Sequence, residues 1–482
     1  MTNDWDNIPQ PKKPTEEEKK ASIEKAENKG KEIKEKYQEE TRTSFFTKDG
    51  KIFEQVVNEG QSKFAVWDES KKEVTYIPYY ETNYGKTYFP NEGEEIKDEE
   101  NKDEYIHLPS KAEEYENDEV LEEDIKGFIR KWLDIDEEHL QYAVWSIKQS
   151  WIYDKLRTVN YLRALGDTTM GKTRYLDTLG RLHYKAIKTS GASTVAPVFR
   201  LIKKWKGSLL IDEFDLKSSD ETADFIKLIN LGFEKGQPIL RCNPSNPEKI
   251  DFFDPYCPKL LATRKPFLDM ATESRCFTKI MTGTDRTDIP VELDNSFFNE
   301  AMKLRNKLLM WRFKNYFRVS IDKVKNIDLG DLEPRVRQTH IGYLPLFAHD
   351  EKKLEFFKKY LQQYQQDLIE DRKDSFEGKI VEAFCSLVFS KGKEDIAPMD
   401  IITEGNFIDT RDSKKPYSPI SLGRYLKELG LGNRKTRNVG GQAKNCVVWQ
   451  EKQLRNLAKR YGVKIVDIYK SATIEETSWD TL

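Results

Sequence analysis

The sequence predicts an α/β protein: a parallel-sheet core with a helical lid, a β-rich module before it and a helical, basic module after it. Two observations support this. Short apolar runs at 159–165, 208–211 and 258–262 each end in polar residues or glycine, as buried parallel strands do. Stretches with apolar residues at helical spacing separate these runs, and such alternation favours parallel strands.

The strongest motif follows the first of these runs. Residues 166–173 form a complete GxxxxGK[ST] phosphate loop between a strand and a helix, a context that argues against a chance match. Lys172 is expected to reach the β- and γ-phosphates of ATP, and Thr173 to place its hydroxyl on Mg²⁺. The rest of the loop is expected to cradle the phosphates with backbone N–H groups: Gly166, Asp167, Thr168, Thr169, Met170 and Gly171.

Two carboxylates end the second apolar run. Asp212 suits the Mg²⁺ shell, and Glu213 is placed to polarise a water for attack on the γ-phosphate. A surface strand that ends in acidic residues would explain the pair by itself, but not its position downstream of a phosphate loop. The pair favours hydrolysis over phosphoryl transfer to a small molecule.

The third run ends at Thr263 and Arg264, and we expect Thr263, or Arg264 close behind it, to contact the γ-phosphate or hold the attacking water. Ser274-Arg275-Cys276 then precedes a strand-like run at 278–281. This order of motifs resembles the AAA+ ATPases, and the tripeptide is similar to the Ser-Arg-Cys of clamp loaders and the Ser-Arg of replicative helicases. The resemblance implies that Arg275 reaches a neighbouring subunit's nucleotide as a trans finger. Alone, Arg275 would be interpreted as a solvated or salt-bridged charge.

The composition fits a large, highly charged intracellular protein of two to four domains. The 482 residues are 34% charged, and the start has no signal-peptide pattern, so we expect a cytoplasmic protein without a membrane span. Five scattered cysteines and five histidines predict neither a disulfide framework nor a zinc module. Residues 1–130 carry 21 Lys/Arg against 34 Asp/Glu, whereas the remainder carries 59 against 49. Nucleic acid is therefore expected on the later part of the chain.

Three segments are expected before the ATPase core at 151–289. Residues 1–43 form a charged, partly disordered arm, 44–110 a small β-rich module, and 111–150 an acidic linker with a helical prelude. The tyrosines of the β-rich module could form a stacking surface, but they are more simply explained as its core.

Two features of the core and lid suggest contacts with ligands. Residues 236–253 are expected to form a β-hairpin, similar to the pore hairpins of viral and minichromosome-maintenance-type helicases, so that Lys235, Arg241 and Lys249 would touch DNA. An ordinary loop with solvated lysines explains this segment equally well. The helical lid is expected at 290–370, and the resemblance implies that its Arg335 or Arg337 contacts the nucleotide in cis.

The segment 371–470 looks like a winged-helix DNA-binding domain, followed by a tail at 471–482. Residues 411–460 hold 13 Lys/Arg against 3 Asp/Glu, which favours DNA over a protein partner. Expected phosphate contacts come from the third helix and the hairpin: Arg424, Lys427, Arg434, Lys435, Arg437 and Lys444.

The whole chain resembles the AAA+/superfamily-3-like ATPases of plasmid, viral and prophage replication modules. This resemblance implies a homo-oligomer, a hexameric ring, that hydrolyses ATP with Mg²⁺ and translocates on DNA as a replicative helicase, with replication or mobile-element proteins as further partners. The alternative is an ATP-switched DNA-binding loader or regulator without unwinding activity. A nonenzymatic scaffold is disfavoured by the intact Lys172, Thr173, Asp212 and Glu213.

Overall fold

The computed structural model describes residues 39–92, 105–190, 193–213, 220–243, 246–267, 269–408 and 415–466. The chain divides into two compact units. The first runs to Asp328 and includes Arg337–Glu351, and the second comprises Leu329–Val336 and the chain from Lys352 onwards. Most of the expected arm and all of the expected tail lie outside the described residues. Among the helices that are described, none has the length and apolar character needed to cross a bilayer.

A six-stranded sheet forms the centre of the first unit, in the order β15-β9-β14-β11-β10-β8. Neighbouring strands are parallel except for β10 and β8, which are antiparallel. The mixed α/β class with a parallel sheet is thus as predicted. The strands are β8 (Ile106–His107), β9 (Tyr161–Leu165), β10 (Ala186–Ser190), β11 (Leu209–Asp212), β14 (Lys259–Thr263) and β15 (Cys276–Ile280).

Two strands of this sheet were not predicted. β10 has only two buried residues, Ala186 and Ile187, so it gives no apolar run, and β8 has only two residues, at the end of the segment expected to form the β-rich module. Along the chain, the acidic strand β11 is therefore the second strand after the phosphate loop, because β10 comes between them. In space, β14 separates β11 from β9.

The main helices of the core follow the predicted amphipathic patterns. α4 packs closely against β11 and β14 at Gly180, where an added Cβ would lie 2.4 Å from Leu210 Cδ1 and would force that side chain to shift. α5 lies against β10, and α2 packs on α3 and α4. The bounds are α2 (Asp118–Trp132), α3 (Glu137–Ser150), α4 (Lys172–Gly180), α5 (Val195–Trp205), α6 (Asp220–Leu231) and α7 (Met270–Glu273).

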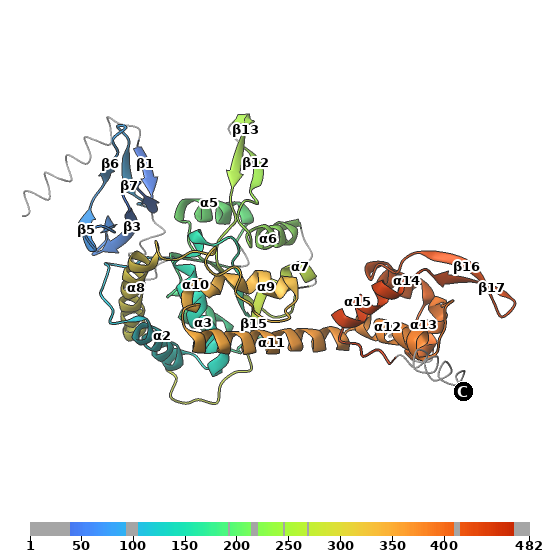
Figure 1. The fold of residues 1–482 in the computed structure, drawn as a ribbon. Coiled ribbons are helices and arrows are strands. Elements are labelled where there is room, and N and C mark those ends of the chain that lie inside the picture. Colours follow the sequence, from blue (N-terminus) through green and yellow to red (C-terminus); the bar gives the residue numbers. More distant parts are fainter. Residues whose placement is uncertain are drawn as a thin grey trace, which may run out of the picture. The chain divides into compact units, whose positions relative to one another are not determined.

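The expected hairpin is present between α6 and β14. β12 (Ile239–Asn243) pairs antiparallel with β13 (Asn246–Phe253), and the two strands stand out from the first unit next to α5 (Figure 1). The base of the hairpin rests on α5, where the ring centroids of Phe253 and Phe199 are 5.8 Å apart. The turn residues 244–245 lie outside the described part.

The β-rich module also belongs to the first unit and holds two small sheets. Phe53, Phe64 and Val66 form a core cluster against which Phe45 and Tyr80 pack. The core explanation therefore holds for Tyr80, whereas Tyr76 and Tyr84 are exposed and lie outside this cluster. Its strands are β1 (Glu39–Arg42), β2 (Ser44–Phe46), β3 (Lys51–Asn58), β4 (Gln61–Asp68), β5 (Glu73–Ile77), β6 (Tyr80–Glu81) and β7 (Thr87–Pro90).

The expected lid is divided between the two units. α8 (Asn295–Asn315) packs against α2, and its buried Arg305 donates to the Leu108 carbonyl, so this helix is part of the first unit. The remaining helices of this region are α9 (Pro334–His340), α10 (Leu344–Phe347) and α11 (Glu351–Asp374).

The second unit contains helices and a hairpin in the order expected for the C-terminal module, around one apolar core that includes Ile380, Leu422 and Leu454. Among the described residues, this C-terminal module has one α-helix beyond the expected elements, α15. The elements are α12 (Phe376–Cys385), α13 (Pro398–Glu404), α14 (Pro419–Glu428), β16 (Arg434–Val439), β17 (Gln442–Val447) and α15 (Glu451–Arg460).

Candidate nucleotide site

The phosphate loop joins β9 to α4 and lies against two neighbouring strands. Gly166 N donates to the Thr263 carbonyl at 3.2 Å, and Met281 N donates to the Leu165 carbonyl at 2.7 Å. A Cβ at position 166 would lie 2.7 Å from the Met281 carbonyl oxygen, so only glycine fits there. Gly171 has φ +84°, a conformation that glycine adopts without strain.

The start of α4 has the features of an anion site. No side chain caps its first turn, which leaves backbone N–H groups for a ligand. Lys172 is half-buried, and its Nζ donates to the Asp167 carbonyl at 2.6 Å, so the ammonium group lies over the loop. Thr173 is exposed. The loop residues therefore fit a phosphate chain.

The strand register places the other predicted residues at the same edge of the sheet. Thr263 pairs with Leu165, the last residue before the loop. Asp212 lies one step beyond the last β11–β14 pair, Ile211 with Leu261, and is level with the end of β14. Both positions lie at the carboxyl ends of parallel strands, the edge at which such sheets bind ligands.

The acidic pair has a constrained backbone. Asp212 is half-buried and its Oδ1 accepts from Glu213 N at 2.9 Å. Glu213 is exposed and has φ +51°, a left-handed conformation that costs a non-glycine residue energy and is often found at functional sites. A carboxylate and a hydroxyl are hard oxygen ligands suited to Mg²⁺, which takes its other ligands from phosphates and waters.

Thr263 is the most informative residue of this edge. Its side chain is 1% exposed, and among the described residues its Oγ1 has no hydrogen-bond partner. Buried hydroxyls normally have partners, so this group is available to a ligand or a water. Arg264 follows directly and is exposed.

Arg275 lies at the opposite edge. It precedes β15, and its carbonyl accepts from Tyr161 N at the start of β9. The four steps from Tyr161 to Leu165 separate it from the phosphate loop by roughly 13 Å. Its guanidinium lies over Phe233, whose carbonyl accepts from Val159 N, still further from the loop. Arg275 therefore does not meet the phosphate loop of its own chain.

One of the two predicted lid arginines, Arg337, is not brought to the loop either. Arg337 donates to the Ile327 carbonyl at 3.1 Å, and the next residue, Gln338, accepts from Thr158 Oγ1. Thr158 precedes β9, so Arg337 lies near the edge that holds Arg275. Arg335 belongs to the second unit, and its contact with a nucleotide stays a prediction.

Of the three basic residues predicted around the hairpin, only two lie on it. Arg241 faces α5, 5.0 Å from the Phe199 ring, and pairs with Asp224 at 3.2 Å, whereas Lys249 is exposed. Lys235 donates to the Asp154 carbonyl and its backbone N to the Arg157 carbonyl, which places it near the Arg275 edge. The opposite face of the hairpin is apolar and exposed, with Leu240, Ile250 and Phe252.

The second unit holds the remaining predicted DNA contacts. Arg424 and Lys427 are exposed on α14. In the hairpin, Arg437 and Lys444 are directly opposed across the strands, and Arg437 also pairs with Asp395 at 3.4 Å. Lys435 is exposed, whereas the half-buried Arg434 donates to the Leu431 carbonyl.

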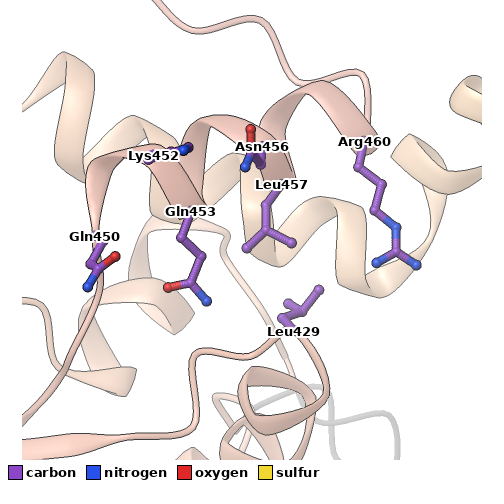
Figure 2. Close-up of a pocket in the computed structure, with 7 residues that line it drawn as sticks. All are labelled: Leu429, Gln450, Lys452, Gln453, Asn456, Leu457 and Arg460. Carbon is purple, nitrogen blue, oxygen red and sulfur yellow. The ribbon is translucent and has the colours of Figure 1, made fainter. Parts of the chain in front are cut away.

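The structure adds a polar pocket of about 380 Å³ on α15 that the sequence did not predict (Figure 2). It brings two further cations, Lys452 and Arg460, to the basic module. The pocket is lined by Leu429, Gln450, Lys452, Gln453, Asn456, Leu457 and Arg460.

An ion pair near the site, between a buried arginine and a half-buried glutamate, was also missed. Arg163, in the middle of β9, is 1% exposed and pairs with Glu273, two residues before Arg275. The two residues are 110 positions apart in sequence, so no local pattern links them. The only signal is a charged residue inside an apolar strand.

Comparisons with known proteins give no family. No protein-family model matches the sequence, and no curated protein matches it. The apo structure of the NrS-1 C-terminal region is similar at 11% identity over 82% of this chain and 96% of that chain, with a TM-score of 0.38. A structure titled "SCCmec type IV Cch - active helicase" is similar at 9% identity over 92% and 85%, with a TM-score of 0.40. TM-scores this low carry no argument.

Proposed function

We propose that this chain is a Mg²⁺-dependent ATPase of the AAA+/superfamily-3-like type that assembles into a ring, translocates on DNA and acts as a replicative helicase of a mobile element or virus. One observation carries the proposal. The phosphate loop, Asp212 and Thr263 share one edge of the sheet, whereas Arg275 lies at the other edge. A second copy could supply its Arg275 to a site that lacks one.

The chemistry follows from the residues at the first edge. The N–H groups of the loop and Lys172 hold the phosphates, and Thr263 orients the γ-phosphate or the attacking water. Glu213 accepts a proton from that water. Thr173 and Asp212 would hold Mg²⁺, which would supply positive charge next to the phosphates. Arg275 of a neighbouring copy stabilises charge on the transferred group.

The basic residues of the second unit support DNA as the substrate of the cycle. Arg437 and Lys444 lie directly opposite each other, and like charges in that position destabilise a hairpin. Asp395 offsets part of this repulsion through its pair with Arg437, and a phosphate backbone would relieve the remainder. Arg424 and Lys427 on α14 provide further exposed cations.

A mixing experiment tests the composite site. Arg275→Ala copies should bind nucleotide normally and hydrolyse it about 10³-fold more slowly. Glu213→Gln copies should bind without hydrolysing. A mixture should regain hydrolysis, because an intact phosphate loop then meets an intact Arg275. A mixture no more active than its components refutes a trans arginine.

A strand-displacement assay separates helicase from loader. With ATP and forked DNA, the wild-type ring should unwind the duplex, and its size should be measured with and without nucleotide. Hydrolysis and DNA binding without unwinding would favour the loader or regulator.

A further inference from the structure

The ion pair Arg163–Glu273 links the strand that carries the phosphate loop to the segment that carries Arg275. Arg163 Nη1 lies 2.6 Å from a Glu273 carboxylate oxygen, and Nη2 contacts the other oxygen, so the pairing is bidentate. Such pairing fixes direction as well as distance. Arg163 is three residues before Gly166, and Glu273 is two residues before Arg275.

Further contacts lock both partners. Arg163 Nε donates to Thr278 Oγ1 at 3.0 Å, and its guanidinium lies 5.1 Å from the Phe267 ring. Glu273 accepts from Phe267 N at 2.8 Å, four residues after Thr263. Glu273 therefore joins three parts of the molecule: β9, the start of β15 and the chain that leaves the Thr263 end of β14.

A second set of bonds fixes the short helix α7 on α6. Asp269 accepts from Thr272 Oγ1 at 2.6 Å and from Asn230 Nδ2 at 2.7 Å. The Arg275 guanidinium lies over the Phe233 ring. Its Nη1 donates to the carbonyl of Ala271, four residues earlier, and among the described residues the buried Nε has no partner. Its position thus depends on the segment that Glu273 and Asp269 hold.

We infer that Arg163 and Glu273 are positioning residues that set Arg275 for the nucleotide of a neighbouring copy. The Arg163 side chain is 1% exposed, so its charge is costly to desolvate, whereas the Glu273 side chain is 27% exposed. A role in placing Arg275 explains why charges stand there. This inference rests on the proposed trans site.

Glu273→Gln tests the pair, because the amide keeps an acceptor for Phe267 N and removes the charge that orients Arg163. Nucleotide affinity should be unchanged, since no phosphate-loop residue is altered. Turnover should fall about 10- to 100-fold, as expected when a catalytic group is displaced by about 1 Å. Glu137→Gln is the matched control: it breaks an exposed Arg–Glu pair with Arg130 and should leave turnover at the wild-type value.

The decisive measurement is rescue in mixtures. Glu273→Gln copies have an intact phosphate loop and a displaced Arg275, so mixing them with Glu213→Gln copies should restore hydrolysis as it does for Arg275→Ala. A purely structural defect would lie in the copy's own site and would not be rescued. Normal turnover of Glu273→Gln, or failure of its rescue while Arg275→Ala is rescued, overturns the inference. If Arg275→Ala is not rescued, the trans site fails and the inference falls with it.

A milder variant covers the case in which Glu273→Gln does not fold. Thr278→Val removes only the acceptor of Arg163 Nε and keeps the shape of the side chain. It should lower turnover by about 3- to 10-fold without changing nucleotide affinity, and it should be rescued in the same mixture. Wild-type turnover of this variant, or a loss that the mixture does not repair, overturns the inference.

Discussion

Replacing Thr263 by valine should make the protein more stable and less active. The Thr263 hydroxyl is buried and has no partner among the described residues. An unsatisfied buried polar group costs about 1–3 kcal/mol, and valine has the same shape without that group. We therefore expect the free energy of unfolding without nucleotide to rise by about 1 kcal/mol.

Turnover should change in the opposite direction. If Thr263 orients the γ-phosphate or the attacking water, its loss removes one polar contact to the reacting groups. Such contacts are worth about 10²-fold in kcat. Denaturant unfolding and steady-state ATP hydrolysis at saturating ATP measure the two effects on the same sample.

Thr178 offers a matched control for this experiment. It is fully buried on α4, and its hydroxyl also has no partner among the described residues. Thr178→Val should gain a similar stability but hydrolyse ATP at the wild-type rate. Lower stability of Thr263→Val, or unchanged turnover, would refute the assignment of this hydroxyl to the nucleotide site.

Three other predictions concern different parts of the chain. Lys172→Ala should abolish ATP hydrolysis; surviving wild-type hydrolysis would rule out this site. Lys444→Ala should weaken DNA binding and reduce the slope of log affinity against log salt by about 1, as measured by titrations at several salt concentrations, and an unchanged slope would contradict a phosphate contact. Burial lowers the pKa of His139 to about 3 and of His183 to about 4. Because the unfolded chain then binds more protons below pH 6.5, stability should fall with falling pH, by about 2 kcal/mol for each histidine at pH 5. An equal free energy of unfolding at pH 7 and pH 5, measured by denaturant titration, would contradict this prediction.

The parts of the site that the sequence predicted are those with a local cause. The phosphate loop and Asp212-Glu213 each lie within a few residues of a buried apolar run, so pattern and position coincide. The hairpin at 239–253 was likewise marked by its own turn residues. β10 was missed because only two of its residues are buried, and the exposed remainder gives no apolar run.

The parts that the sequence did not predict depend on contacts between distant segments. Lys235 is near the hairpin in sequence, but its bond to the Asp154 carbonyl holds it at the other edge of the sheet. α8 was expected in a lid, but Arg312 on it is buried against Glu54 and Asp154. Neither contact leaves a trace in the local pattern of either segment.

The expected boundary near residue 110 does not separate two independent bodies, because the β-rich module completes the core. Glu54 on β3 is fully buried, and it pairs with Lys185 and Arg312, both about equally buried. Removing one partner of a buried pair costs about 3–5 kcal/mol, because the other charge is left uncompensated. The module also supplies Thr43, whose Oγ1 donates to the Trp205 carbonyl at the end of α5. Since α5 supports the hairpin through Phe199, the β-rich module stabilises the element on which that hairpin rests.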